Sequence, residues 1–134
     1  MTVLTNLKTG LAANLATITN MRTSTQIPEQ PQPPVAIITL NTINYDTTFG
    51  RGLDEYLFTV TVLVSRADGR NAQNLLDPYC ASSGTLSVKS AIELDRSLGG
   101  SANDCRVTGL STYGNLTIGE TNYLAGEWSV TVFA

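Results

Sequence analysis

The chain has 134 residues, a hydrophobic fraction of 42% and a formal net charge of −3. This length suffices for one compact core and is short for two ordinary domains, so residues 1–134 are expected to form a single domain. The 8 Lys and Arg residues are scattered along the chain, which argues against a phosphate-binding surface, because affinity for nucleic acid comes from clustered basic side chains.

The sequence also bears on location. No run approaches the ~18 to 20 apolar residues that a transmembrane helix needs, and the N-terminus lacks the basic-then-apolar order of a signal peptide. We therefore expect a protein that acts in the cytoplasm where it is made.

Cys80 and Cys105 form no CxxC motif, and the chain has no histidine to complete a zinc site. In a reducing cytosol we expect two small buried hydrophobic side chains, the alternative being a disulfide formed late, after release into an oxidising medium.

An amphipathic helix is predicted from about Thr2 to Thr19. Gly10 costs such a helix up to ~1 kcal/mol relative to Ala, so the helix must be stabilised by packing its apolar stripe on a flat partner, a sheet. The stripe, whose members are three or four positions apart, consists of Leu4, Leu7, Leu11, Leu15 and Ile18. The polar residues that fall on or near the other face are Lys8, Thr9, Asn14 and Thr17.

Extended structure follows the helix. After a short segment at Arg22–Thr25, four prolines favour an extended connector, because proline lacks the amide donor and restricts the residue before it. Val35–Leu40 is apolar on both faces and fits a central strand. Between this strand and the next, the polar stretch Asn41–Asp54 is predicted to be a hairpin loop that reaches well beyond the sheet.

Glu55–Ser65 alternates strictly between two faces, which predicts a strand with one core face. The core face consists of Tyr56, Phe58, Val60, Val62 and Val64. The other face is half-polar and a candidate contact surface, and it consists of Leu57, Thr59, Thr61, Leu63 and Ser65.

Two short helices are predicted next. Asp68 caps the first, whose apolar residues are Ala72, Leu75, Leu76 and Tyr79 and whose last turn Pro78 weakens. The second spans about Leu86–Leu94 and turns Val88, Ala91 and Ile92 inward. Leu98 followed by Gly99-Gly100 is predicted to end this helical segment in a turn, since glycine permits the positive φ that a turn needs.

The chain closes with two predicted strands, Asp104–Tyr113 and Asn122–Phe133, joined by a stretch marked by Gly114-Asn115 and Gly119. The order of elements predicts an α+β fold: an antiparallel-dominated mixed sheet of about four to five strands, with the N-terminal helix and two short helices packed on one face. In the last strand, Trp128 lies on the apolar face, so core packing is the favoured interpretation over an aromatic ligand platform.

Catalytic chemistry has little support in the sequence. Without histidine there is no Ser-His-Asp or Cys-His pair, and the one carboxylate cluster is Asp46, Asp54 and Glu55. These carboxylates could coordinate a hard cation, but the favoured interpretation is that Asp46 caps a turn and Asp54 flanks a strand. Gly50-Arg51-Gly52 lacks the rest of a phosphate-binding loop and is interpreted as a kink that presents Arg51. No catalytic residue, metal or cofactor is therefore predicted, and the protein is not expected to be an enzyme.

Several short sequence motifs together make the chain resemble the tail terminator (tail-completion) proteins of long-tailed, siphovirus-type bacteriophages. They are Pro33-Pro34-Val35-Ala36, the stretch Tyr45–Tyr56, Leu98-Gly99-Gly100 and Arg106-Val107-Thr108-Gly109, set in the order helix, proline-broken link, hairpin loop and closing strand. The resemblance covers nearly the whole chain. Pro78 and Cys80 depart from it, because an uninterrupted helix is expected there.

This resemblance implies a non-enzymatic virion subunit that forms a ring, six-fold in the family. One ring face would cap the last ring of major tail tube protein and stop its elongation, and the other would receive the head–tail connector or stopper protein. DNA would pass through the ring without specific binding. The protein would assemble in the cytoplasm of the bacterial host and reside at the head–tail junction of the virion, with no membrane partner.

The resemblance also indicates the contact loop, with Phe49 and Arg51 as its anchors. The residues expected to contact the tube or a neighbouring subunit are Tyr45, Asp46, Thr47, Thr48, Phe49, Gly50, Arg51 and Asp54. Two alternatives stay open. One is another virion part, either a head–tail stopper or a tail tube subunit, and the other is a small acidic enzyme or binding module.

Overall fold

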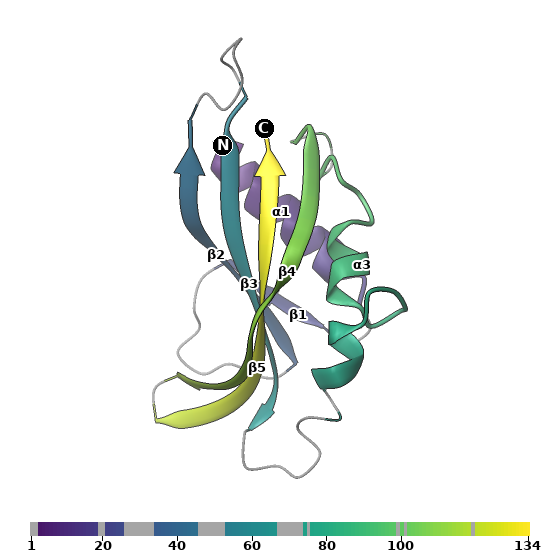
Figure 1. Cartoon of the computed structure of the whole chain (residues 1–134), viewed down its shortest axis with the longest axis vertical. Coiled ribbons are helices and arrows are strands. Elements are labelled where there is room, and N and C mark those ends of the chain that lie inside the picture. The colour runs from purple at the N-terminus through teal and green to yellow at the C-terminus, as the bar shows by residue number, and fades with distance from the viewer. Residues whose placement is uncertain are drawn as a thin grey trace.

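The computed structural model describes residues 3–18, 21–25, 34–45, 53–66, 74, 76–98, 100, 102–118 and 120–134. The fold is α+β, with one mixed five-stranded sheet in the order β1-β2-β3-β5-β4 and the helices on one of its faces (Figure 1). This confirms the predicted fold class. The elements are α1 Val3–Leu15, β1 Arg22–Ser24, β2 Val35–Asn44, β3 Glu55–Arg66, the 3-10 helix η1 Asp77–Cys80, α3 Val88–Ile92, β4 Asp104–Ile118 and β5 Thr121–Phe133.

Helix α1 packs its apolar stripe on the sheet as predicted, with Leu7, Leu11, Leu15 and Ile18 all fully or almost fully buried. The placement of Asn14 on the polar face was wrong. Its side chain is buried, and Nδ2 donates hydrogen bonds to the backbone oxygens of the segment that follows α3. Helical periodicity places residues on a face, but it cannot show that a polar side chain has a distant partner.

Strand β2 is longer than predicted. A bulge between Leu40 and Thr42 shifts the register, and the pairing with β3 then continues to Asn44 opposite Glu55. The connection between the two strands is therefore shorter than the predicted loop, which began at Asn41. Polar residues favour loops only on average, and here cross-strand pairing overrides that preference. The short β1 runs parallel to the start of β2 and makes the sheet mixed.

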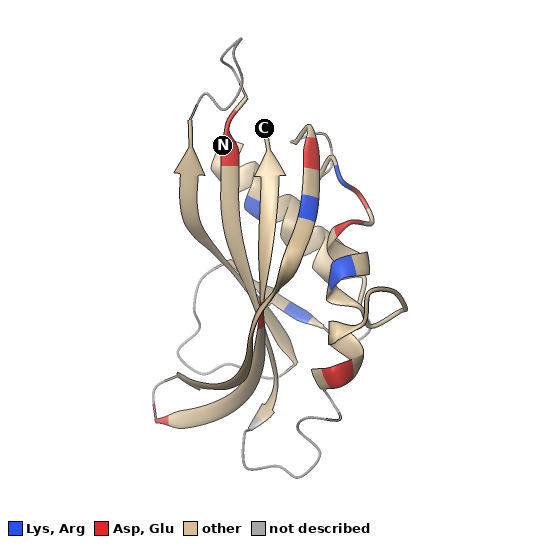
Figure 2. Cartoon of the chain, in the orientation of Figure 1, with Lys and Arg blue, Asp and Glu red and all other residues tan. Residues whose placement is uncertain are grey.

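Strand β3 has the predicted two faces. Its core face is buried against the helices, and this face comprises Tyr56, Phe58, Val60, Val62 and Val64. Trp128 on β5 joins the same core with 3% of its surface exposed, which confirms core packing for this aromatic side chain. The middle parts of the strands carry few charges, as Figure 2 shows.

Strands β4 and β5 form a long hairpin that curls strongly (Figure 1). The prediction that β4 ends at Tyr113 was wrong, because Gly114 and Asn115 continue the ladder opposite Ala125 and Leu124. The strand absorbs two register shifts before this point, and these bulges increase its local twist. The extended end of the hairpin then reaches past the body of the sheet.

The segment predicted to hold two short helices is described in part. Asp68, Ala72 and Leu75 lie outside the described residues, whereas η1 accommodates Pro78 in its first turn, where proline removes no helical hydrogen bond. Helix α3 begins after Ser87, whose Oγ accepts a hydrogen bond from the Ser90 amide at 3.1 Å. The inward residues predicted for this helix are all buried, namely Val88, Ala91 and Ile92.

Both cysteines are free thiols, with Cys105 fully buried in the core and Cys80 half-buried beside it. This agrees with their interpretation as small hydrophobic side chains. Within the described ranges, no helix has the length and apolar character needed to cross a bilayer.

Candidate interaction surface

The sheet packs only one of its faces against helices. Helix α1 and the segment from η1 to α3 share the main core with that face, and no described helix crosses the other one (Figure 1). We call this second face the open face. It is formed by the side chains that alternate with the core residues along each strand. In the central part of the sheet they include Ile37 and Thr39 on β2, Leu57, Thr59 and Thr61 on β3, and Glu127, Ser129 and Thr131 on β5.

The register sets these side chains in rows across the sheet. Thr61 on β3 lies between Ile37 on one neighbouring strand and Glu127 on the other. The next row consists of Thr39, Thr59 and Ser129. Side chains directly opposite one another in antiparallel strands lie within contact distance, so each row is a continuous strip. In these two rows the open face therefore presents hydroxyl groups next to one carboxylate, that of Glu127.

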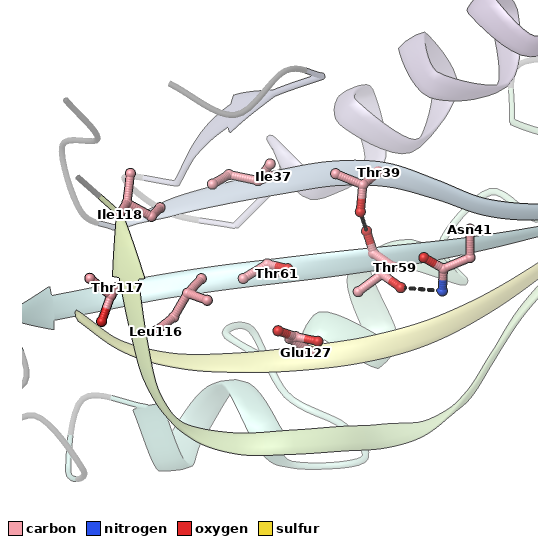
Figure 3. A pocket seen from close by; sticks show the side chains of 9 residues that line it. All are labelled: Ile37, Thr39, Asn41, Thr59, Thr61, Leu116, Thr117, Ile118 and Glu127. Atoms are coloured by element: carbon pink, nitrogen blue, oxygen red, sulfur yellow. Dashed lines mark hydrogen bonds between the residues drawn. The ribbon is translucent and has the colours of Figure 1, made fainter. Parts of the chain in front are cut away.

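The curled end of the β4–β5 hairpin closes one end of the open face. There, Leu116 and Ile118 pack against a second buried cluster that is separate from the main core. That cluster comprises Val35, Ile37, Leu63, Tyr123 and Ala125. Because the hairpin end turns over the strands, it forms a wall above them, as Figure 3 shows.

A half-open groove of about 480 Å³ lies between this wall and the strands (Figure 3). Its volume falls within the range of ligand pockets, roughly 300–1,000 Å³. The apolar part of its lining is formed by Ile37, Leu116 and Ile118. The polar part is formed by Thr39, Asn41, Thr59, Thr61, Thr117 and Glu127.

Hydrogen bonds fix one side of the groove. Thr39 Oγ1 donates to the backbone oxygen of Thr59 at 3.2 Å, and Asn41 Nδ2 donates to Thr59 Oγ1 at 2.6 Å (Figure 3). At the hairpin end, the Thr117 hydroxyl donates to the side-chain oxygen of Asn122. Thr39 and Thr117 use their hydroxyl protons in these contacts, so the lone pairs of these two hydroxyl oxygens can accept hydrogen bonds from a ligand.

Glu127 is the only ionisable residue among the described lining of the groove. Its side chain is half-buried, and no described residue donates a hydrogen bond to its carboxylate or forms an ion pair with it. A partly desolvated carboxylate interacts with an opposite charge more strongly than one in bulk water does. The groove is thus suited to a positively charged group.

The predicted contact loop is described only at its two ends. Tyr45 is 72% exposed. Asp54 is tied to the end of β5, because its backbone N–H donates to the oxygen of Ala134 at 2.9 Å and its oxygen accepts the Ala134 N–H at 3.0 Å. Neither Tyr45 nor Asp54 lines the groove. The other predicted residues lie outside the described part of the chain, namely Asp46, Thr47, Thr48, Phe49, Gly50 and Arg51.

The residues at the loop ends influence the pKa of Tyr56. Burial raises the pKa of the Tyr56 hydroxyl, and the nearby Asp54 and Tyr45 raise it further. Where the loop leaves the sheet, Asn44 at the end of β2 donates from Nδ2 to Glu55 Oε1 at the start of β3, at 2.9 Å. Hydrogen bonds thus join Asn44 to Glu55 and Asp54 to Ala134 where the loop meets the strands.

Asp46 of the carboxylate cluster lies outside the described residues, and among the described ones no three Cys, Asp or Glu side chains gather as metal ligands. Sequence reasoning did not single out Glu127. In the sequence it is one polar residue in an alternating strand, and its position beside Thr61 follows only from the strand register.

No family model matches the sequence, and a search of curated proteins finds no match either. The functional interpretation therefore depends on the sequence features and on the geometry of the open face. That geometry offers a surface for binding, with a groove, hydroxyl acceptors and one carboxylate.

Proposed function

We propose that this protein is a tail terminator of a long-tailed bacteriophage, a structural subunit that forms a ring on the end of the tail tube. The observation that carries the proposal is the open face. An antiparallel sheet often leaves one face to water, but here that face bears a walled groove with a carboxylate that pairs with no described residue, which suits contact with another polypeptide. The resemblance of the chain to the terminator family supplies the identity of that polypeptide.

Ring formation requires two different lateral surfaces on each subunit, because a head-to-tail contact joins unlike patches. The helix-covered side and the open face differ in chemistry, which supports such a contact. The sheet also has two edges on opposite sides, β1 and β4. Since β1 pairs only with Val35–Ile37, no described strand runs along that edge of β2 from Ile38 to Asn44. An edge of this kind can pair with another chain.

In this proposal the ring has six subunits, as in the family. One ring face caps the major tail tube protein and the other receives the head–tail connector or stopper protein. The net charge of −3 suits a ring through which DNA passes without specific binding. The subunit acts as a structural part without catalysis or cofactor, assembles in the bacterial cytoplasm and ends at the head–tail junction of the virion.

The test is the assembly state of the purified protein. Light scattering across a concentration series should find monomers when dilute and rings when concentrated or when tail tubes are present, because multivalent contact with the tube strengthens weak lateral contacts. Electron microscopy should then show single rings capping tubes. Stacked tubes would favour a tube subunit instead. A stable two-fold dimer at every concentration would contradict the proposal.

The hairpin loop provides the second test. Phe49→Ala and Arg51→Ala should leave the circular dichroism spectrum unchanged and prevent capping, so that tails overrun their normal length or fail to join heads. A matched control is Ser82→Ala with Ser83→Ala, in an exposed segment on the helical side. If tails of normal length form with both loop variants, the loop is not the contact surface.

A further inference from the structure

We propose that the outer part of β4, from Thr108 to Ile118, is a strap that opens locally, and that the hydrogen bond between Tyr113 and Asp77 is the latch that holds it closed. In the closed position, which the structure shows, the far end of the strap forms part of the wall of the groove. Such a motion does not depend on ring formation, so it goes beyond the proposed function.

The strap contains no buried residue. In the inner part of β4, Cys105 and Val107 are buried in the main core. Every residue from Thr108 to Tyr113 is exposed, and the rest of the strap is exposed or half-buried. On the partner strand β5, by contrast, residues 123–126 are all buried. A segment with few buried contacts and exposed backbone hydrogen bonds opens at a lower free energy than the core does.

The pairing of the strap with β5 is interrupted by two register shifts. The residue that each shift leaves out of the ladder donates its side-chain hydroxyl to a backbone oxygen of β5. Thr108 Oγ1 donates to Ser129 and Ser111 Oγ donates to Glu127, each at 3.1 Å. Both hydrogen bonds are exposed, so water competes for them and their net contribution is small. Because β4 is the last strand of the sheet, β5 is its one neighbouring strand in the described sheet.

One side chain connects the strap to the helical side. The Tyr113 hydroxyl donates to Asp77 Oδ1 at 2.7 Å. Asp77 begins η1, and Leu76 and Tyr79 next to it are buried in the main core, so η1 is a fixed support. A hydrogen bond to a carboxylate is stronger than one between neutral groups. The same hydrogen bond is the main cause that raises the pKa of Tyr113 to about 12.

The position of the latch lets it control the far end of the strap. Tyr113 follows both register shifts and precedes the residues that line the groove, which begin at Leu116. Gly109 and Gly114 flank this stretch, and a β-carbon built on either would meet no atom of the described residues within 4 Å. The chain therefore has room to bend there. Loss of the latch releases the far end without disturbing the inner part of β4.

Opening changes the open face of the sheet. In the closed strap, Leu116 and Ile118 pack on the second buried cluster, in which Ile37 is 2% and Leu63 is 0% exposed (Figure 3). When the strap opens, the groove loses part of its wall and these apolar side chains gain contact with water. Exposure of apolar surface is unfavourable, so the closed strap predominates. The latch adds to this preference.

Amide hydrogen exchange followed by NMR measures the opening. In the wild type, the strap amides that pair with β5 should exchange faster than the amide of Val130, which lies in the main core. Tyr113→Phe removes the hydroxyl alone and should speed exchange of the strap amides by about fivefold or more, with that of Val130 unchanged. The matched control is Ser111→Ala, which removes an exposed hydroxyl of the same strap that bonds to β5 and should change exchange by less than about twofold.

Variants of Asp77 test the partner of the latch. Asp77→Ala should speed exchange of the strap amides as much as Tyr113→Phe does. The double variant should be no faster than either single one, because both substitutions remove the same hydrogen bond. Asp77→Asn keeps an acceptor oxygen and should retain most of the protection. A merely structural role of Asp77 in η1 would instead make the two single effects additive.

Two results would overturn the proposal. If the strap amides and Val130 exchange at the same rate in the wild type, the strap opens only when the whole protein unfolds. If Tyr113→Phe and Ser111→Ala act equally, the hydrogen bond to Asp77 is not a latch. None of these measurements requires a ring, so a failure of the proposed function would leave them unaffected.

Discussion

Gly10 of α1 lies so close to Leu98 that no side chain fits between them. A β-carbon on Gly10 would stand 2.6 Å from Leu98 Cβ and 2.8 Å from the Leu98 backbone oxygen. Leu98 itself has a φ of 50°, a left-handed conformation that leucine rarely adopts. The glycine that weakens α1 by its helix propensity is therefore the residue that lets the helix pack on the segment before β4.

Gly10→Ala should destabilise the protein even though alanine is the better helix former. The propensity gain is up to ~1 kcal/mol, whereas forcing a methyl group into a filled space costs about 1–3 kcal/mol. Urea denaturation followed by circular dichroism measures the difference. Gly109→Ala is the control, because a β-carbon there meets nothing within 4 Å, and its free energy of unfolding should be unchanged or slightly raised. A gain in stability for Gly10→Ala would show that the contact with Leu98 relaxes freely.

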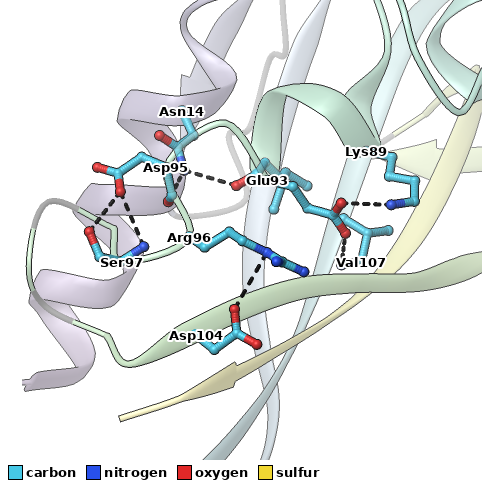
Figure 4. Close-up of polar contacts among 9 residues, drawn as sticks. Asn14, Lys89, Glu93, Asp95, Arg96, Ser97, Asp104 and Val107 are labelled. Carbon is cyan, nitrogen blue, oxygen red and sulfur yellow. Dashed lines mark hydrogen bonds and ion pairs between the residues drawn. The ribbon is translucent and has the colours of Figure 1, made fainter.

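Asn14 joins α1 to the end of α3 (Figure 4). Its Nδ2 donates to the backbone oxygens of Ile92 and Asp95, each at 3.0 Å. Asn14→Ala should lower the free energy of unfolding by about 1–3 kcal/mol, because it leaves carbonyl groups at a helix end without their donor. Thr9→Ala on the same helix removes an exposed hydrogen bond to the Thr5 oxygen and should change stability by less than about 0.5 kcal/mol. Equal effects of the two substitutions would contradict a structural role for Asn14.

The fold was predictable where one strand or helix identifies its own buried face. The leucine stripe of α1 and the alternation from Tyr56 to Val64 each specify a face without knowledge of the partner, and both are confirmed. Trp128 could be assigned to the core for the same reason. Local patterns therefore give the elements and the two faces of the sheet.

Features that depend on distant partners could not be predicted. Asn14 bonds to an oxygen 78 positions away, which no local pattern reveals. Gly114 and Asn115 have turn-forming preferences, but pairing with β5 holds them in a strand. The groove depends on the curl of the hairpin, and the position of Glu127 depends on register, so the candidate site emerged only from the three-dimensional arrangement.

The two thiols should react slowly in the folded protein. Burial first, and then the nearby charges of Asp104 and Glu93, raise the pKa of Cys105 to about 12. Burial also raises the pKa of Cys80, with a further contribution from Asp77. The reactive form is the thiolate, so little of either residue is reactive at pH 8. Titration with an aromatic disulfide reagent should be slow in native buffer, slowest for Cys105, and should find both thiols at once in non-reducing denaturant. Finding neither in denaturant would establish a disulfide.

Glu93 connects α3 to the outer edge of the sheet (Figure 4). One carboxylate oxygen accepts a hydrogen bond from Lys89 Nζ at 2.6 Å, and the other accepts the backbone N–H of Val107 at 2.9 Å. Burial alone would raise the pKa of this carboxyl, but these hydrogen bonds and the charges of Lys89 and Arg96 outweigh burial and lower it. The carboxylate thereby satisfies a donor on edge strand β4, where another strand would otherwise pair.

The lowered pKa of Glu93 makes its contribution to stability depend on pH. A carboxyl whose pKa is lower in the folded state stabilises that state above its unfolded pKa, about 4.3, and loses this effect as the pH falls through the folded value. Glu93→Gln should therefore be less stable than the wild type by about 1 kcal/mol at pH 7, and the gap should narrow as the pH falls from 5 to 3. Urea denaturation at pH 7, 5 and 3 measures it, with Glu120→Gln, an exposed carboxylate, as the control. A gap of the same size at pH 3 would show that the carboxylate charge contributes nothing and that only the shape of the side chain matters.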